Sequence, residues 1–68
     1  MPARQDGRIF RHGTSGVVVI PPGYLKYHEL NPGDEVAILY DSLVLIIPKK
    51  LMSIAVEKRE LIDKLLRG

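Results

Sequence analysis

The sequence predicts a small, mainly β protein with short helices that is stable only as an oligomer. Residues 16–20 and 35–47 consist largely of β-branched and aliphatic residues, which favour strands. The chain has 68 residues, of which 46% are hydrophobic, and it has no cysteine, so disulfides and cysteine-bound zinc cannot supplement its core. Because so small a core rarely stabilises a fold by itself, we expect a partner chain to complete it.

The first half of the chain is expected to form a hairpin followed by a short helix. Residues 7–12 suit a short strand, and the polar residues 12–16 read as a glycine-bounded turn. A second strand is predicted over residues 16–20, which are β-branched at four successive positions. Pro22 can open a helix because its missing N–H would be unpaired there in any case. We place that helix over residues 22–29.

The second half begins with a turn and a second hairpin. In the tetrapeptide 31–34, proline at the second position and glycine at the third indicate a type II turn. Residues 35–40 and 43–48 then read as two strands joined by Asp41-Ser42. The last strand is apolar at every position from 43 to 47, whereas a strand with one solvent-exposed face would alternate apolar and polar residues. We therefore expect both of its faces to be covered.

Residues 53–67 are predicted to form one amphipathic helix that docks on this sheet or on a partner. Ser53 is a candidate N-cap, and Gly68 follows the last helical residue. The apolar stripe is interrupted at Lys58, which argues against a long coiled coil. Two charged pairs have i, i+4 spacing, Glu60 with Lys64 and Arg59 with Asp63. We therefore divide the chain into a β-rich segment over residues 1–50 and a helix within residues 51–68, both in one compact unit.

The formal net charge of +2 hides an uneven distribution along the chain. Residues 1–28 carry four basic and one acidic side chain, residues 29–47 carry four acidic and no basic ones, and residues 48–68 carry six basic and three acidic ones. A basic N-terminal segment rich in arginine favours a polyanionic partner. A solvated basic face that binds nothing is the competing interpretation.

The residues offer little for catalysis, metal binding or membrane insertion. The two histidines, His12 and His28, are sixteen positions apart and match no metal-ligand spacing. Ser15 lies near His12, but nothing in the sequence supplies a third, orienting residue. No apolar run approaches the roughly 20 residues of a membrane span, and no secretory signal is visible. We expect a cytoplasmic protein with no enzymatic activity, no metal and no cofactor.

Basic and polar side chains cluster around the first predicted turn. Arg8 and Arg11 flank Phe10, the turn adds His12, Thr14 and Ser15, and Lys26 follows on the short helix. The planar fork of arginine forms two parallel hydrogen bonds to phosphate or guanine, and turn hydroxyl and N–H groups can fix the register on a DNA backbone. The cluster therefore indicates a candidate DNA-binding surface, with a solvated basic face as the alternative, and a plain hairpin turn as the alternative for the turn itself.

Two runs of residues resemble a known family. Residues 11–21, RHGTSGVVVIP, are similar to the signature R-x-G-[NT]-S-x-x-V-x-I-P of the AbrB, MazE and SpoVT swapped-hairpin superfamily. Residues 30–36, LNPGDEV, resemble the G-L-x-x-G-D-E-V that follows in that family, at the same spacing. The resemblance implies an intertwined homodimer with a swapped-hairpin barrel, binding double-stranded DNA as a repressor-like regulator or serving as the antitoxin of a toxin–antitoxin pair. By position, the resemblance implies DNA contacts for Arg11, Thr14, Ser15 and Lys26. Together with the basic cluster, we predict as DNA-binding residues Arg4, Arg8, Arg11, His12, Gly13, Thr14, Ser15 and Lys26.

The sequence also departs from the family pattern. Relatives often carry a basic residue on the second strand where this chain has Val17 or Val19, and a glycine where it has Glu29. Arg4 and Arg8 are candidates to compensate, the valines could contact thymine methyl groups, or the face could bind protein. An antitoxin tail of the MazE type is long and acidic, whereas about 20 residues after Pro48 are net basic here. We therefore favour a regulator whose helix caps its own dimer, and keep a toxin-binding helix as the alternative.

Overall fold

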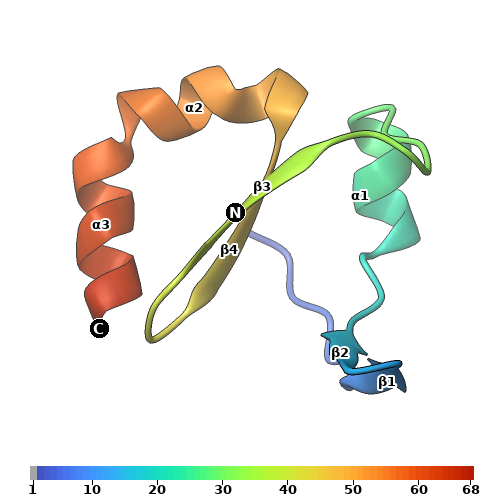
Figure 1. Cartoon of the computed structure of the whole chain (residues 1–68). Coiled ribbons are helices and arrows are strands. Elements are labelled where there is room, and N and C mark those ends of the chain that lie inside the picture. The colour runs from blue at the N-terminus through green and yellow to red at the C-terminus, as the bar shows by residue number, and fades with distance from the viewer. Residues whose placement is uncertain (1) are drawn as a thin grey trace. The chain divides into compact units, whose positions relative to one another are not determined.

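The computed structural model describes residues 2–68 of the chain (Figure 1). It contains two small two-stranded antiparallel sheets and several short helices, so the expectation of a β-rich fold with helices is confirmed at this level. The elements are β1 (Phe10–His12), β2 (Ser15–Val17), α1 (Pro22–Tyr27), β3 (Val36–Tyr40), β4 (Val44–Pro48), the 3-10 turn η1 (Lys49–Leu51), α2 (Met52–Glu57) and α3 (Arg59–Arg67). They form two compact units, an N-terminal unit that ends at Asn31 and a C-terminal unit that begins at Pro32.

The sheet of the N-terminal unit is a hairpin with shorter strands than the sequence predicts. Phe10 lies opposite Val17 at its open end, and His12 lies opposite Ser15 at its turn. The predicted second strand, 16–20, is therefore wrong at both ends, because β2 starts one residue earlier and ends at Val17. Val17 pairs with Phe10, the first residue of β1, so the residues after Val17 have no partner in this strand.

Helix α1 begins at Pro22, as predicted, but ends two residues before the predicted end at Glu29. The backbone turns left-handed at Glu29, where φ is +53°. The Glu29 N–H then donates to the Lys26 carbonyl at 3.3 Å, and the Leu30 N–H donates to the Leu25 carbonyl at 2.8 Å. This pair of bonds is the Schellman arrangement, which satisfies the last carbonyls of the helix and stops it.

The C-terminal unit opens with the predicted turn, in which Gly33 has φ of +99°, the region that the third position of a type II turn requires. The following hairpin has Val36 opposite Pro48 and Tyr40 opposite Val44. Strand β4 starts one residue later than predicted, because Leu43 belongs to a three-residue loop. Its carbonyl accepts a hydrogen bond from the Asp41 N–H at 2.9 Å.

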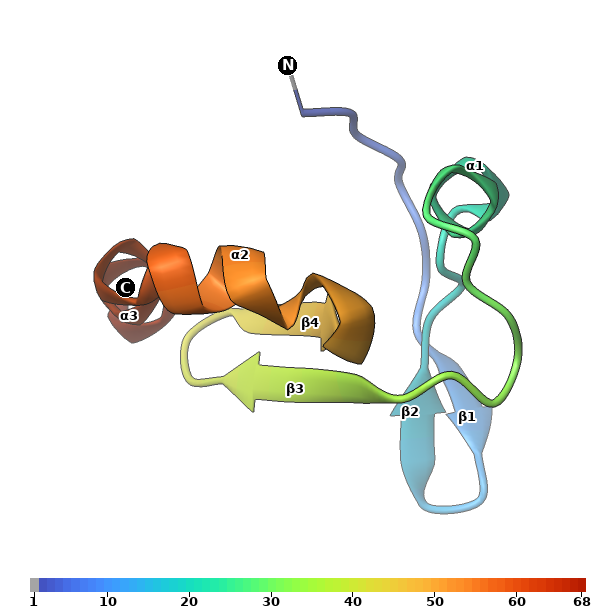
Figure 2. The same ribbon diagram turned by 90° about the horizontal axis from the view of Figure 1, so that it is seen from above.

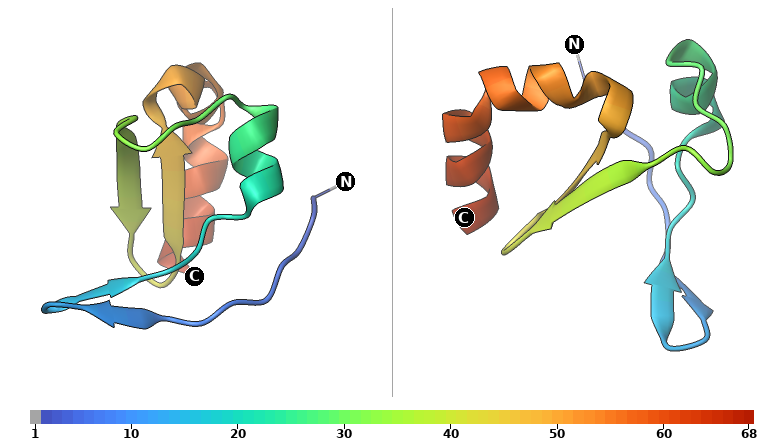
Figure 3. Two further views of the ribbon diagram at one scale, coloured as in Figure 1. Left: turned by 90° about the vertical axis from the view of Figure 1, so that its right-hand side faces the viewer. Right: turned by 45° about the horizontal axis from the view of Figure 1, so that its top comes forward.

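Within the C-terminal unit, helices α2 and α3 cover the β3–β4 hairpin from one side (Figure 3). Ile47, which lies opposite Ala37, is only 7% exposed and forms the centre of the core. The other face alternates with it and includes the pair Tyr40 and Val44, which remain 77% and 66% exposed. Ile46 is half-buried and Pro48 is buried on this same face of β4. In the single chain, the expectation that both faces of the last strand are covered therefore fails only at its start, at Val44.

The C-terminal helical segment is two helices rather than one. Lys58, with φ of −107° and ψ of 22°, leaves the helical conformation and separates α2 from α3 at the point where the apolar stripe is interrupted. Ser53 is not the N-cap, because the chain enters α2 through η1 and is already helical at Met52. Gly68 does end α3, with φ of +79°.

The ion pair on α3 also differs from the expected ones. Within the residues that the structure describes, Asp63 pairs with Arg67 one turn later, at 2.6 Å, rather than with Arg59. An acid that precedes a base by four residues has the more favourable orientation on a helix, and Arg67 also lies in the last turn, where positive charge is stabilising.

A contact that the sequence does not suggest joins the hairpin loop to the end of α3. The Ser42 N–H donates to the Leu66 carbonyl at 2.8 Å, and the Ser42 hydroxyl donates to the Arg67 carbonyl at 3.3 Å. These bonds satisfy carbonyls that have no partner within the helix. The loop therefore caps α3 and holds the helix end against the hairpin, as the ribbon shows (Figure 1).

Candidate nucleic-acid interface

The tip of the β1–β2 hairpin is a two-residue turn made of Gly13 and Thr14. Gly13 has φ of +62°, and glycine at the first central position with this sign of φ is typical of a type II′ hairpin turn. A Cβ at Gly13 would meet nothing within 4 Å, so the backbone conformation, and not lack of space, favours glycine here. The turn keeps its polar residues at an exposed tip.

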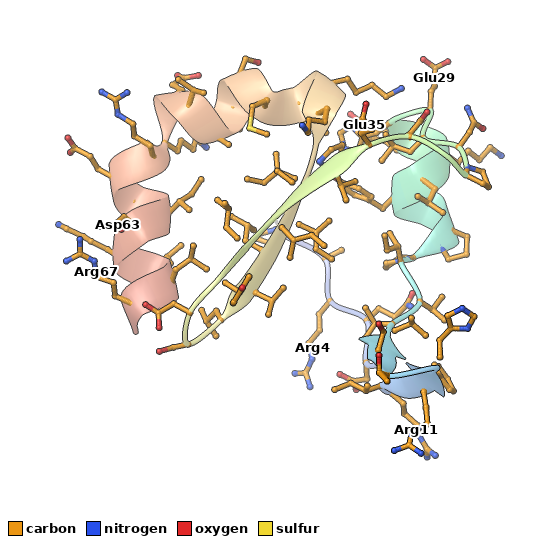
Figure 4. The ribbon with its side chains drawn as sticks, viewed as in Figure 1. Arg4, Arg11, Glu29, Glu35, Asp63 and Arg67 are labelled. Carbon is orange, nitrogen blue, oxygen red and sulfur yellow. The ribbon has the colours of Figure 1, made fainter. Side chains whose placement is uncertain are left out.

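The two faces of the hairpin carry different predicted site residues. Arg11 lies opposite Gly16 on one face, whereas His12 lies opposite Ser15 on the other. Arg11 projects away from the ribbon near the tip (Figure 4). The structure therefore brings together the residues of the predicted turn, but it splits Arg11 and His12 between opposite faces.

Gly16 shapes the face that carries Arg11. A Cβ added to Gly16 would lie 2.9 Å from the Cγ2 atom of Ile9, which is closer than such contacts occur. Ile9 precedes Arg11 by two residues and so lies on the same side of the chain. Glycine at this position lets Ile9 lie against the backbone beside Arg11.

Arg4 and Arg8 lie in the segment that leads into β1 and has no regular secondary structure (Figure 2). The Arg4 guanidinium pairs with the Asp6 carboxylate, with Nε and Nη2 each 3.0 Å from Oδ1. Both side chains are exposed, and a pair of this kind contributes at most about 1 kcal/mol. A phosphate can therefore replace Asp6 as the partner of Arg4 at little cost.

Lys26 lies in the last turn of α1, on an element separate from the hairpin (Figure 1). Three ring side chains also meet at the C-terminal end of this helix, which ends at Tyr27, and the motifs in the sequence do not indicate them. The His28 ring lies 4.7 Å from the Tyr24 ring and 4.9 Å from the Tyr27 ring, measured between centroids. The i, i+4 spacing of Tyr24 and His28 is the signal that could have revealed them.

The predicted site residues present an exposed set of polar groups. The predicted residues of the tip, the leading segment and α1 are all exposed, and they supply guanidinium, ammonium, hydroxyl and backbone N–H donors. Over residues 2–68, no group of three or more histidine, aspartate or glutamate side chains is placed to hold a metal ion. In the same part of the chain, no helix is both long and apolar enough to cross a bilayer.

Residues 9–52 match the model of the family described as antidote-toxin recognition MazE, bacterial antitoxin. This match covers well over half of the chain, and the chain therefore belongs to the MazE antitoxin family. That family is part of the AbrB/MazE swapped-hairpin superfamily, to which the sequence motifs pointed. No curated protein and no solved structure matches the chain.

Proposed function

We propose that this chain is a homodimeric, non-enzymatic regulator that binds specific double-stranded DNA through the β1–β2 hairpin. The observation that carries the proposal is the exposed tip of that hairpin, where Arg11 and the Gly13–Thr14 turn lie together within the matched family region. Arginine and turn donors are suited to phosphates and base edges. Lys26, Arg4 and Arg8 add positive charge from neighbouring segments of the same unit.

The proposed dimer rests on the apolar surface that the single chain leaves open. Tyr40 and Val44 are adjacent on the open face of the β3–β4 hairpin, and Ile38 lies on the same face and is also exposed. A chain of this size with so little buried core needs a second copy to cover that surface. In the superfamily pattern, that second copy interleaves its hairpins with the first.

The experiment that tests DNA binding is fluorescence anisotropy of a labelled random-sequence duplex, titrated with protein at several salt concentrations. We expect the logarithm of the affinity to fall linearly with the logarithm of salt, with a slope that counts the phosphates neutralised. Selection of a preferred operator from a random pool would follow. A duplex that stays unbound at low salt contradicts the proposal, because the basic residues would then be merely solvated.

A second candidate function is that of an antitoxin, and the family description favours it. The matched region ends at residue 52, so most of α2 and all of α3 lie outside it. The test is to ask whether a small open reading frame beside the gene encodes a ribonuclease-like protein, and to measure its binding to the purified chain by calorimetry. Binding that is lost when α3 is removed would favour the antitoxin.

A further inference from the structure

Helix α3 has two apolar sides, and the C-terminal unit uses one of them. Ile62 and Leu66 are half-buried and line a groove of about 610 Å³ between α2, α3 and the β3–β4 hairpin. Leu61 and Leu65 lie one turn apart on another side and are 56% and 55% exposed. Leu61 and Leu65 thus form an apolar stripe, here called the outer stripe, that the C-terminal unit leaves more than half exposed.

The charges beside the outer stripe indicate what can cover it. Glu60 and Lys64 are one turn apart and lie on the same flank of the stripe, since each precedes one of the two leucines by one residue. A strongly acidic or strongly basic partner would be repelled by one of the two. A partner that presents a basic group to Glu60 and an acidic group to Lys64 complements both. A second α3 that runs antiparallel presents its own Lys64 and Glu60 in that order.

We propose that α3 is a second self-association surface, through which one dimer binds another by antiparallel pairing of α3 helices. When two copies pair about Ile62, Lys64 of each copy lies opposite Glu60 of the other, and two reciprocal ion pairs form. Leu61 then inserts between Leu61 and Leu65 of the second copy, as a knob enters a hole. In a parallel pair, the flank with Glu60 and Lys64 would instead face the opposite flank of the second copy, which carries Ile62, and these ion pairs would not form.

The proposal rests on the homodimer of the proposed function, and its test separates the two. Sedimentation equilibrium of the full chain from about 1 μM to 1 mM should show a species larger than a dimer at high concentration. Leu61→Glu should abolish this species and leave the dimer and its circular dichroism unchanged. A wild-type chain that stays dimeric over the whole range overturns the α3 interface alone, whereas a monomer overturns the dimer as well.

Charge reversal tests the pairing geometry without disturbing the leucines. Lys64→Glu should weaken the larger assembly by about tenfold or more, because it places glutamates opposite each other at both ends. The double variant Glu60→Lys with Lys64→Glu restores opposite charges and should recover the assembly. If the double variant is as weak as the single one, Glu60 and Lys64 are not partners.

Cysteine crosslinking gives a second measure of direction, because the native chain has no cysteine. The single variants Glu60→Cys and Lys64→Cys are mixed and oxidised. Antiparallel pairing predicts disulfides between the two different variants, separable by mass, in excess of those within each. Disulfides that form only between identical variants contradict the antiparallel arrangement.

Discussion

Glu29 occupies a backbone position at the end of α1 that suits glycine better. Its φ of +53° lies in the left-handed region, which costs a residue with a Cβ about 1–2 kcal/mol. The superfamily pattern carries glycine here, so in this chain a residue with a Cβ occupies a position that favours glycine. The hydrogen bonds of Leu30 and of Glu29 itself to the preceding turn hold the residue in this conformation.

Replacing Glu29 by glycine should therefore stabilise the protein. The relief of the left-handed strain exceeds the extra flexibility that glycine gives the unfolded chain, so we expect a gain of about 0.5–1 kcal/mol in the free energy of unfolding. Urea unfolding at a fixed protein concentration measures it. Glu29→Ala is the matched control, because it removes the same side chain and keeps the Cβ. An equal gain in both variants would locate the effect in the side chain instead.

Arg11 is the residue on which the proposed DNA contact depends most. Arg11→Ala should weaken binding to a selected operator by about 1–3 kcal/mol, or roughly 5- to 150-fold, if the guanidinium contacts a base. Anisotropy titration measures the change. Lys49→Ala removes the same charge from η1 in the other unit and should have a much smaller effect. Equal losses for the two variants would reduce Arg11 to a contributor of net charge.

At the scale of the elements, the two helices after β4 form a cover for one hairpin and have little stability of their own. Helices of six and nine residues are too short to persist in water without tertiary packing. They depend on the contact of α2 with β4 and on the bonds from Ser42 to the end of α3. In return they bury Ile47, the centre of the core.

Deleting residues 51–68 should therefore promote aggregation. The deletion uncovers Ile47 and its neighbours on the helix-facing side of the β3–β4 hairpin, which adds to the apolar surface already open on the other side. Light scattering and the soluble fraction after expression measure the outcome. A truncated chain as soluble and stable as the full one would mean that the helices serve a partner and not the core.

Prediction from sequence succeeded where a local rule decides the structure. Pro22 opens a helix, Gly33 takes the left-handed position of its turn, and Gly68 ends α3, each for a reason contained in a few adjacent residues. The break at Lys58 was signalled by the interrupted stripe, although one continuous helix was expected. The Ser42 cap joins residues 25 positions apart, and no local pattern encodes such a contact.

The candidate site was predictable in composition but not in its arrangement. The motif located the turn and its arginine, and the structure places Gly13 at the turn accordingly. The opposite faces of Arg11 and His12 follow from strand pairing, because alternate residues of a strand point to opposite sides. The sequence predicts the faces of these side chains only when the pairing register of β1 and β2 is known. Here that register depends on which residue starts β2.

At the scale of the whole molecule, the exposed face of the β3–β4 hairpin predicts that folding and assembly are linked. Val44→Glu should shift the chain toward monomer, because a charge in the proposed interface would be buried without a partner. Sedimentation equilibrium measures the mass, and the midpoint of thermal unfolding of the native chain should rise with protein concentration. Val44→Thr, similar in shape, should have a milder effect. A concentration-independent midpoint would contradict the dimer.

The bonds from the hairpin loop to α3 also make Ser42 a reporter of local opening. Its N–H donates to Leu66, so this amide can exchange with deuterium only when α3 leaves the hairpin. The rate of exchange at this one backbone position therefore measures how often the helix detaches. An event that separates α3 from the hairpin would speed that exchange, whereas contacts confined to the outer side of the helix would slow it.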